Sequence, residues 1–96
     1  MTVNVRVMAT REQIMRGTTL RLELVGPATV ADVLRRLVAE DRSLIGAVLD
    51  TEPAVSVRPG FALLLNGVNA LHAQRGLQTP VAEGDTLSLI HGITGG

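Results

Sequence analysis

Residues 29–41 have the sequence TVADVLRRLVAED, which carries the most regular helical pattern in the chain. Apolar residues recur there at i, i+3, i+4, i+7 and i+8, namely at Val30, Val33, Leu34, Leu37 and Val38. This spacing gathers them on one face of an α-helix and leaves polar side chains on the opposite face. Thr29 is placed to cap the helix, and Asp32 three residues later completes a variant of the capping box. We therefore predict a helix from Val30 to about Asp41 that packs through one face.

Two strands are predicted before this helix. Residues 2–9 alternate between valines and other side chains, and residues 18–25 alternate between leucines and mostly polar side chains. Alternation with a period of two is typical of a strand that is buried on one face. The polar segment of residues 10–17 is long enough to join the two strands as an antiparallel hairpin. Gly26-Pro27 ends the second strand, because proline has no N–H for the ladder.

Three further strands are predicted after the helix. Residues 61–65 are apolar on both faces, which favours a central strand. Asn66-Gly67 is a strong signature of a hairpin turn, and it leads into a short strand at residues 68–71. Residues 86–91 alternate again and form the last strand. Before these, Leu44-Ile45 and Val48-Leu49 have helical spacing and predict one or two more helical turns.

One helix that faces a mixed sheet of about five strands gives an α+β domain of two layers. A chain of 96 residues has the size of one domain. We expect a single domain over residues 1–96, in which residues 92–96 form a flexible tail.

Composition excludes several classes of function. The charged residues balance to a net charge of zero, so no overall field attracts nucleic acid or an anionic membrane. The chain has no cysteine and only 2 histidines, which argues against thiol chemistry and against a metal site. All 9 basic residues are arginine, so no lysine amine is available for Schiff-base chemistry. No stretch has the pattern of a signal peptide or a membrane span, so we expect a cytoplasmic protein.

Gly95-Gly96 follows the last predicted strand through Ile93-Thr94. Glycine has no Cβ, so two in succession make a thin segment with wide backbone freedom. Such a segment can enter a channel too narrow for other residues and bring its terminal carboxylate to a site on another protein. Glycine at a chain end is also common without any function, so the doublet gains its meaning from the sequence before it.

Several short motifs occur in an order that is typical of one family. Leu65-Asn66-Gly67 ends a predicted strand, and Gly76-Leu77-Gln78-Thr79-Pro80-Val81 and Glu83-Gly84-Asp85 precede the last strand. Thr94-Gly95-Gly96 follows that strand. Together with the hairpin and the helix, these motifs resemble the MoaD/ThiS family of ubiquitin-like sulfur carriers. The likeness is closer to MoaD, the small subunit of molybdopterin synthase, and it covers nearly the whole chain.

This resemblance implies a β-grasp fold with the first and last strands parallel and adjacent. It also implies a carrier rather than an enzyme, with no bound cofactor. An adenylyltransferase of the MoeB/ThiF type uses ATP to convert the Gly96 carboxylate into an acyl-adenylate. A persulfide-bearing sulfurtransferase then converts the adenylate into a thiocarboxylate. A sulfur-accepting synthase subunit consumes the sulfur, in molybdenum cofactor biosynthesis or a related pathway.

The segment before the tail departs from the family. Members commonly carry an aromatic residue and two prolines there, whereas this chain has Ile90-His91-Gly92. We expect a looser tail, because proline fixes φ and glycine frees it. The pathway therefore stays open between molybdopterin synthesis, thiamin synthesis and another sulfur-transfer route. His91 is predicted to be a polar residue at a strand end rather than a catalytic group, and His72 to be a surface residue.

A partner-binding surface is predicted beside the tail. If the valines of the first strand and the leucines of the last strand face the helix, Met8 and Ile90 face away from it. Leu64 lies on the same side of a nearby strand. An apolar patch rimmed by charge is typical of a docking surface, and Ile93 and Thr94 would extend the contact into the tail. Apolar residues scattered on an ordinary surface are the alternative.

Two other functions fit the same sequence. The first is a ubiquitin-like modifier that is joined to target lysines through Gly96. The second is a non-catalytic β-grasp interaction domain whose C-terminal glycines are incidental.

Overall fold

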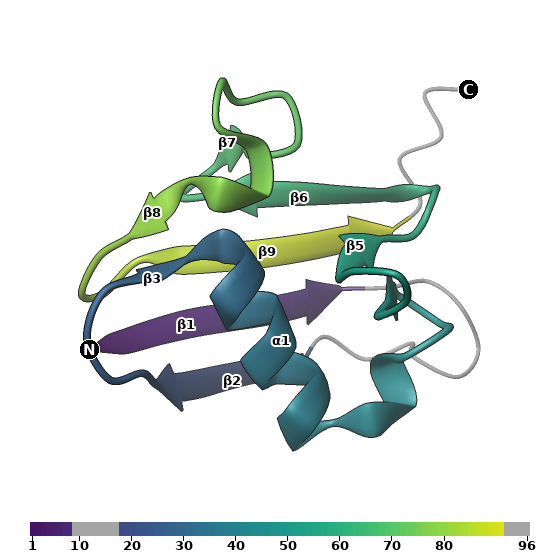
Figure 1. Ribbon diagram of the computed structural model, residues 1–96, viewed down its shortest axis with the longest axis horizontal. Helices are drawn as coiled ribbons and strands as arrows, with labels where there is room; N and C mark the ends of the chain where they lie inside the picture. The colour runs from purple at the N-terminus through teal and green to yellow at the C-terminus, as the bar shows by residue number, and fades with distance from the viewer. Residues whose placement is uncertain (9–17, 92–96) are drawn as a thin grey trace.

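The computed structural model describes residues 1–8 and 18–91, which form a five-stranded sheet covered on one face by a helix (Figure 1). The strand order is β2-β1-β9-β6-β7. The strands are β1 (Thr2–Met8), β2 (Thr18–Glu23), β6 (Phe61–Leu65), β7 (Val68–Asn69) and β9 (Thr86–His91). The prediction of an α+β fold with two layers is confirmed.

The first and last of these strands pair in parallel at the centre of the sheet. Val5 of β1 lies opposite Leu87 of β9, and Val7 lies opposite Leu89. The other neighbouring pairs in this sheet are antiparallel. A first hairpin (β1-β2) whose β1 pairs in parallel with the last strand, with one helix across the sheet, is the β-grasp arrangement that the family resemblance implies.

The predicted helix is confirmed as α1 (Val30–Glu40), and its apolar stripe faces the sheet. The side chains with at most 1% of their surface exposed that meet between the two layers are Val3, Val5, Val7, Val30, Val33, Leu34, Leu37, Leu63, Leu87 and Leu89. Burying a side chain of this kind stabilises a fold by about 1.5–3 kcal/mol. Among the described residues, no helix is long and apolar enough to cross a membrane.

The helix begins at a complete capping box. The Thr29 hydroxyl accepts a hydrogen bond from the Asp32 amide at 3.3 Å, and an Asp32 carboxylate oxygen accepts one from the Thr29 amide at 2.9 Å. The other Asp32 oxygen contacts Arg35 at 2.6 Å. The hydrogen bond from the Thr29 backbone, followed by the Arg35 interaction, holds the pKa of Asp32 below its ordinary value.

The segment after the helix differs from the expected run of helical turns. Arg42–Leu44 forms a single 3-10 turn, η2, and Leu49–Asp50 then becomes strand β4, which pairs with β5 (Ser56–Val57). Gly46 explains the change, because its φ of +84° lies in the left-handed region and turns the chain away from a helical path. Val48 and Leu49 are nevertheless fully buried. Their apolar side chains therefore belong to the core, although they do not lie on a second helix.

The segment before β9 is more ordered than its sequence indicated. Gly76–Gln78 forms a short 3-10 helix, η3, and β8 (Pro80–Val81) pairs with β3 (Ala28–Thr29) at the start of α1. The Val30 amide also donates to the Thr79 carbonyl at 2.9 Å. These contacts tie the N-terminus of the helix to the chain that enters the last strand.

The strand that follows the Asn66-Gly67 turn is shorter than predicted. β7 ends at Asn69, whose side-chain oxygen accepts hydrogen bonds from the amides of Leu71 and His72. A side-chain acceptor that bonds the backbone two and three residues later favours a turn over a continued ladder.

The capping box predicts how the stability of the protein depends on pH. Because the pKa of Asp32 is lower in the folded than in the unfolded state, Asp32 contributes to the free energy of unfolding above its unfolded-state pKa. This contribution is lost as the pH falls through the folded-state pKa. We expect the free energies of unfolding of the wild type and of Asp32→Asn to differ near pH 7 and to converge as the pH falls through the lowered folded-state pKa of Asp32. Urea unfolding between neutral and acid pH measures the free energy of unfolding of both proteins. Their other carboxylates are the same, so the difference between the two curves reports on Asp32. A difference that stays constant down to the most acid point would contradict this role for Asp32.

Candidate functional site

The four tail residues predicted to carry the function lie outside the described residues. These are Ile93, Thr94, Gly95 and Gly96. The last described residue is His91, at the end of β9. The site that the structure does describe is therefore the end of the sheet from which the chain continues to Gly96.

β9 is paired with β1 and β6 as far as Ile90, and with β6 alone at His91. Ile90 lies opposite Met8 of β1 and opposite Ala62 of β6, and His91 lies opposite Phe61. A strand with neighbours on both sides has its backbone groups bonded in two ladders. The end of the sheet beside the tail is thus held by three strands.

His91 stacks against Phe61. Their ring centroids are 4.6 Å apart with an angle of 51° between the ring planes. Phe61 is the only aromatic residue of the chain, and 8% of its surface is exposed. A tilted ring pair at this distance contributes about 0.5–1.5 kcal/mol beyond the burial of its area. His91 is therefore a strand-end residue, as predicted. Its ring contact with Phe61 also holds the end of β9.

Sequence reasoning did not find this ring contact. The pattern places Phe61 in a strand and His91 at the end of another, but it does not give the register between them. The antiparallel pairing of β6 with β9 brings them together. The cross-strand partner of Phe61 could be named only once this register was known.

The face of the sheet away from α1 carries the predicted apolar residues. Met8, Ala62 and Ile90 are direct cross-strand neighbours in one row of this face, and Leu64 is opposite Ser88 in the next row. We call these four residues the outer patch. Met8 is 38% exposed, and the other three are half-buried. Their counterparts Val7 and Leu89 point into the core, so the predicted division between the two faces is confirmed.

Ala62 belongs to the outer patch although the sequence did not single it out. Its small side chain lies next to Ile90 because β6 pairs with β9, and the sequence indicated neither this pairing nor its register. The structure gives the position of the outer patch, and its contact with a partner stays a prediction.

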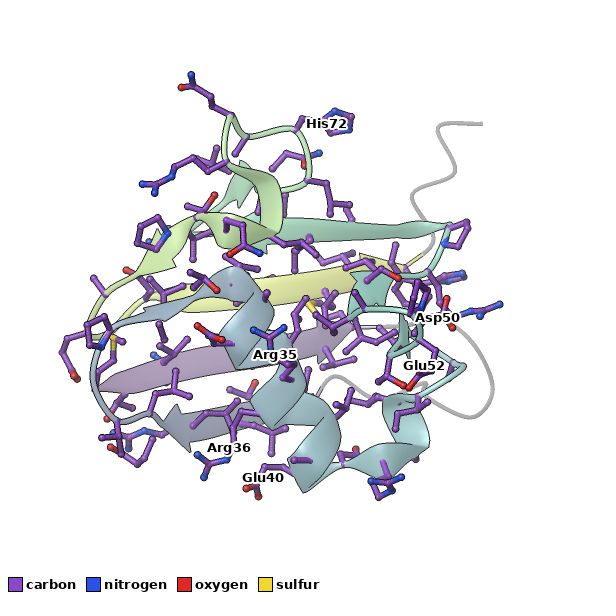
Figure 2. The ribbon with its side chains drawn as sticks, in the orientation of Figure 1. Arg35, Arg36, Glu40, Asp50, Glu52 and His72 are labelled. Atoms are coloured by element: carbon purple, nitrogen blue, oxygen red, sulfur yellow. The ribbon has the colours of Figure 1, made fainter. Side chains whose placement is uncertain are left out.

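Two other polar residues, His72 and Arg58, lie apart from the outer patch. His72 is exposed on the loop after β7, as predicted, and Figure 2 shows it pointing away from the sheet. Arg58 forms an ion pair with Asp50 at 2.9 Å. Within residues 1–8 and 18–91, no group of three or more histidine, aspartate or glutamate side chains could hold a metal ion.

Comparison with known proteins agrees with this fold. Residues 5–96 match the ThiS family. The chain is 30% identical over 96 residues to small archaeal modifier protein 3 of Haloferax volcanii, and the alignment covers 100% of both proteins. The crystal structure of SAMP1 from Haloferax volcanii is similar with a TM-score of 0.74 and 27% identity, over 99% of each chain. The solution structure of another Haloferax volcanii protein has a TM-score of 0.67 and 31% identity, over 100% of this chain and 87% of that chain.

The family resemblance drawn from the motifs is thus confirmed, while the closer likeness to MoaD within it stays a prediction. The matched range runs from β1 through the helix and β9 to Gly96. Because both this range and the full-length relative include nearly every residue, the protein belongs to the ThiS family of β-grasp proteins.

Proposed function

We propose that this protein is a sulfur carrier whose reacting group is the carboxylate of Gly96. The observation that carries the proposal is the match to the ThiS family over residues 5–96, which includes the Gly95-Gly96 doublet. The composition supports it, because a chain with no cysteine and no lysine has neither a thiol nor an amine side chain to carry sulfur itself. In this proposal the protein is a substrate for partner enzymes in the cytoplasm and is not an enzyme.

A carboxylate is a poor electrophile, so a leaving group must be installed before sulfur can be added. The Gly96 carboxylate attacks the α-phosphorus of ATP, which an adenylyltransferase of the MoeB/ThiF type binds, and pyrophosphate leaves. A persulfide on a sulfurtransferase then attacks the acyl carbon and displaces AMP. A second thiol cleaves the resulting acyl disulfide, which leaves the thiocarboxylate on Gly96 and a disulfide on the enzyme. A synthase subunit of the molybdopterin type, or of a related pathway, is the proposed sulfur acceptor.

The position of the outer patch supports a role in docking these partners. Gly96 is five residues beyond His91, and five residues span at most about 17 Å. An enzyme that binds Met8, Ala62, Leu64 and Ile90 therefore has the reacting carboxylate within reach of the same interface. The rest of the carrier surface need not be contacted for the chemistry to occur.

A second candidate function is protein modification through the same carboxylate. The observation that favours it is the full-length identity of 30% to small archaeal modifier protein 3 of Haloferax volcanii. Both functions begin with adenylation of Gly96, and they differ in what attacks the adenylate. A persulfide gives the thiocarboxylate, whereas a lysine amine of a target gives an amide bond with loss of AMP.

Deletion of Gly96 tests whether the carboxyl end is the reacting group. We expect the wild type purified from its own host to contain a species about 16 Da heavier, in which sulfur replaces oxygen. The variant should lack this species and should support no ATP–pyrophosphate exchange, because the acceptor carboxylate is displaced by one residue. Intact-mass spectrometry separates the outcomes, since conjugates to target proteins are far heavier. A variant that retains full exchange would contradict the proposal.

Ile90→Asp tests the outer patch. A charge at the centre of an apolar contact should raise the KM for the carrier in the exchange assay by about tenfold or more, with little change in kcat. Met8→Asp at the more exposed neighbouring position should act in the same direction with less effect on folding. Val25→Asp is the matched control, because Val25 is 101% exposed in the loop after β2, at the other end of the sheet. Equal KM values for the Ile90, Met8 and Val25 variants, all folded by thermal unfolding, would remove the patch from the interface.

A further inference from the structure

The ring pair of Phe61 and His91 lies on the helix side of the sheet and not in the outer patch. The two residues are opposite each other, two positions beyond the inward pair of Leu63 and Leu89. Side chains two positions apart along a strand share a face of the sheet. Ile90, which belongs to the outer patch, points the other way. A substitution at His91 therefore changes the end of β9 and leaves the outer patch intact.

The His91 ring is held by backbone as well as by a ring. A Cβ atom at Gly60 would lie 3.7 Å from both Cδ2 and Nε2 of His91, which is a van der Waals separation. Gly60 has a φ of +93°, a conformation that favours glycine. The imidazole thus lies beside the Gly60 backbone and stacks on the ring of the next residue, Phe61.

The small sheet of β4 and β5 supports this contact. Figure 1 shows β5 at the end of the large sheet where β9 ends, and β5 leads through a short turn into β6. The Arg58 amide donates to the Val48 carbonyl at 2.9 Å, and the Phe61 amide donates to the Arg58 carbonyl at 3.3 Å. The Arg58 guanidinium also pairs with Asp50 at 2.9 Å. Because Val48 is fully buried, the turn before Phe61 is tied to the core.

The end of β9 matters for the proposed function because the reacting group is the end of the chain. Gly96 is five residues beyond His91, and the length of chain between them limits where the carboxylate can be. If β9 opens at Ile90 and His91, this length grows from five to seven residues, 90–96 instead of 92–96. The effective concentration of a tethered group at a fixed site falls as its tether lengthens beyond the span, and reaction rates depend strongly on such placement.

We propose that His91 is a positioning residue for the reaction at Gly96. Its contact with Phe61 keeps β9 closed to its last residue, so the segment that ends in Gly96 starts from a fixed point of the domain. The inference rests on the proposed function and identifies the side-chain contact that sets its geometry. In this role the His91 imidazole transfers no proton and does not touch the partner enzyme.

Replacement of the ring tests this role. The assay is ATP–pyrophosphate exchange by the purified adenylyltransferase of the same organism, with the full-length protein as substrate. We expect His91→Ala to lower kcat about two- to tenfold, the factor that one ring pair is worth, and to leave the KM for the protein within about twofold. His91→Tyr keeps a ring and should retain most of kcat, whereas His91→Gln keeps a polar group alone and should match His91→Ala. A tyrosine variant as slow as the alanine variant would overturn the inference.

The other half of the ring pair gives a second test. Phe61→Leu, which keeps an apolar side chain in the core, should lower kcat in the same way. The double variant Phe61→Leu with His91→Ala should lose no more than either single variant, because both changes remove one contact. His72→Ala is the matched control, since His72 is an exposed histidine on the loop after β7, and it should leave kcat and KM unchanged. Losses that multiply in the double variant, with every protein folded at the assay temperature, would contradict the role.

Hydrogen exchange of backbone amides, followed by NMR, measures the opening of β9 without any enzyme. The Ile90 amide should exchange faster in His91→Ala than in the wild type, and the Leu87 amide should not, because only the end of the strand opens. A lower kcat with unchanged exchange at Ile90 would mean that the ring contacts the enzyme directly, and it would overturn the inference while the proposed function stands. If the wild type itself supports no ATP–pyrophosphate exchange, the proposed function fails and the inference with it.

Discussion

The parallel pairing of β1 with β9 is the constraint on which the rest of the structure depends. These strands come from opposite ends of the described chain, and each is paired on both sides within the sheet. The helix α1 packs against their inward residues, which are the three valines of β1 together with Leu87 and Leu89. The pairing has a large sequence separation, so its loop-closure entropy must be offset by contacts that form together with it. The outer patch shares this requirement, because Met8 and Ile90 become neighbours only when β1 and β9 have paired. A partner that binds across both strands therefore binds only the folded protein.

Strand alternation lets the same residues stabilise the protein and present a surface. Along β1 the odd positions are buried and the even positions face outward, and β9 follows the same rule except that the small Ser88 is covered on the outer side. The core side is purely apolar, so it can be packed without regard to partners. The outer side holds arginines and half-buried apolar groups that contribute little to the core. Substitutions on the two sides are thus expected to have separable effects, a loss of stability on one and a loss of binding on the other.

Much of the fold could be predicted because its longest elements carry strong periodicity. The apolar stripe and the capping box of residues 29–41 gave α1 to within a residue of its end, and alternation placed Met8 and Ile90 on the face away from the helix. The pairs β3-β8 and β4-β5 could not be predicted, because two-residue strands have no period and form only where tertiary contacts hold them. The contact of Phe61 with His91 and the place of Ala62 in the outer patch needed the register of β6 against β9, which no local pattern contains. The tail glycines lie outside the described residues, so their role is argued from the sequence and the family alone.

The composition of the tail makes recognition by the folded domain a necessity for the proposed chemistry. Glycine residues have no side chains, so the Gly95-Gly96 doublet offers an activating enzyme only backbone atoms and a carboxylate. Any other protein that ends in two glycines offers the same atoms, and contacts with the tail cannot distinguish one from another. Specificity is a difference between binding free energies, and here that difference has to arise on surface that varies between carriers. The face of the sheet away from α1 is the surface best placed for this role, because it includes β9, the strand that leads to the tail. In the proposed function, the domain is recognised and the tail reacts, so recognition and reaction belong to different residues.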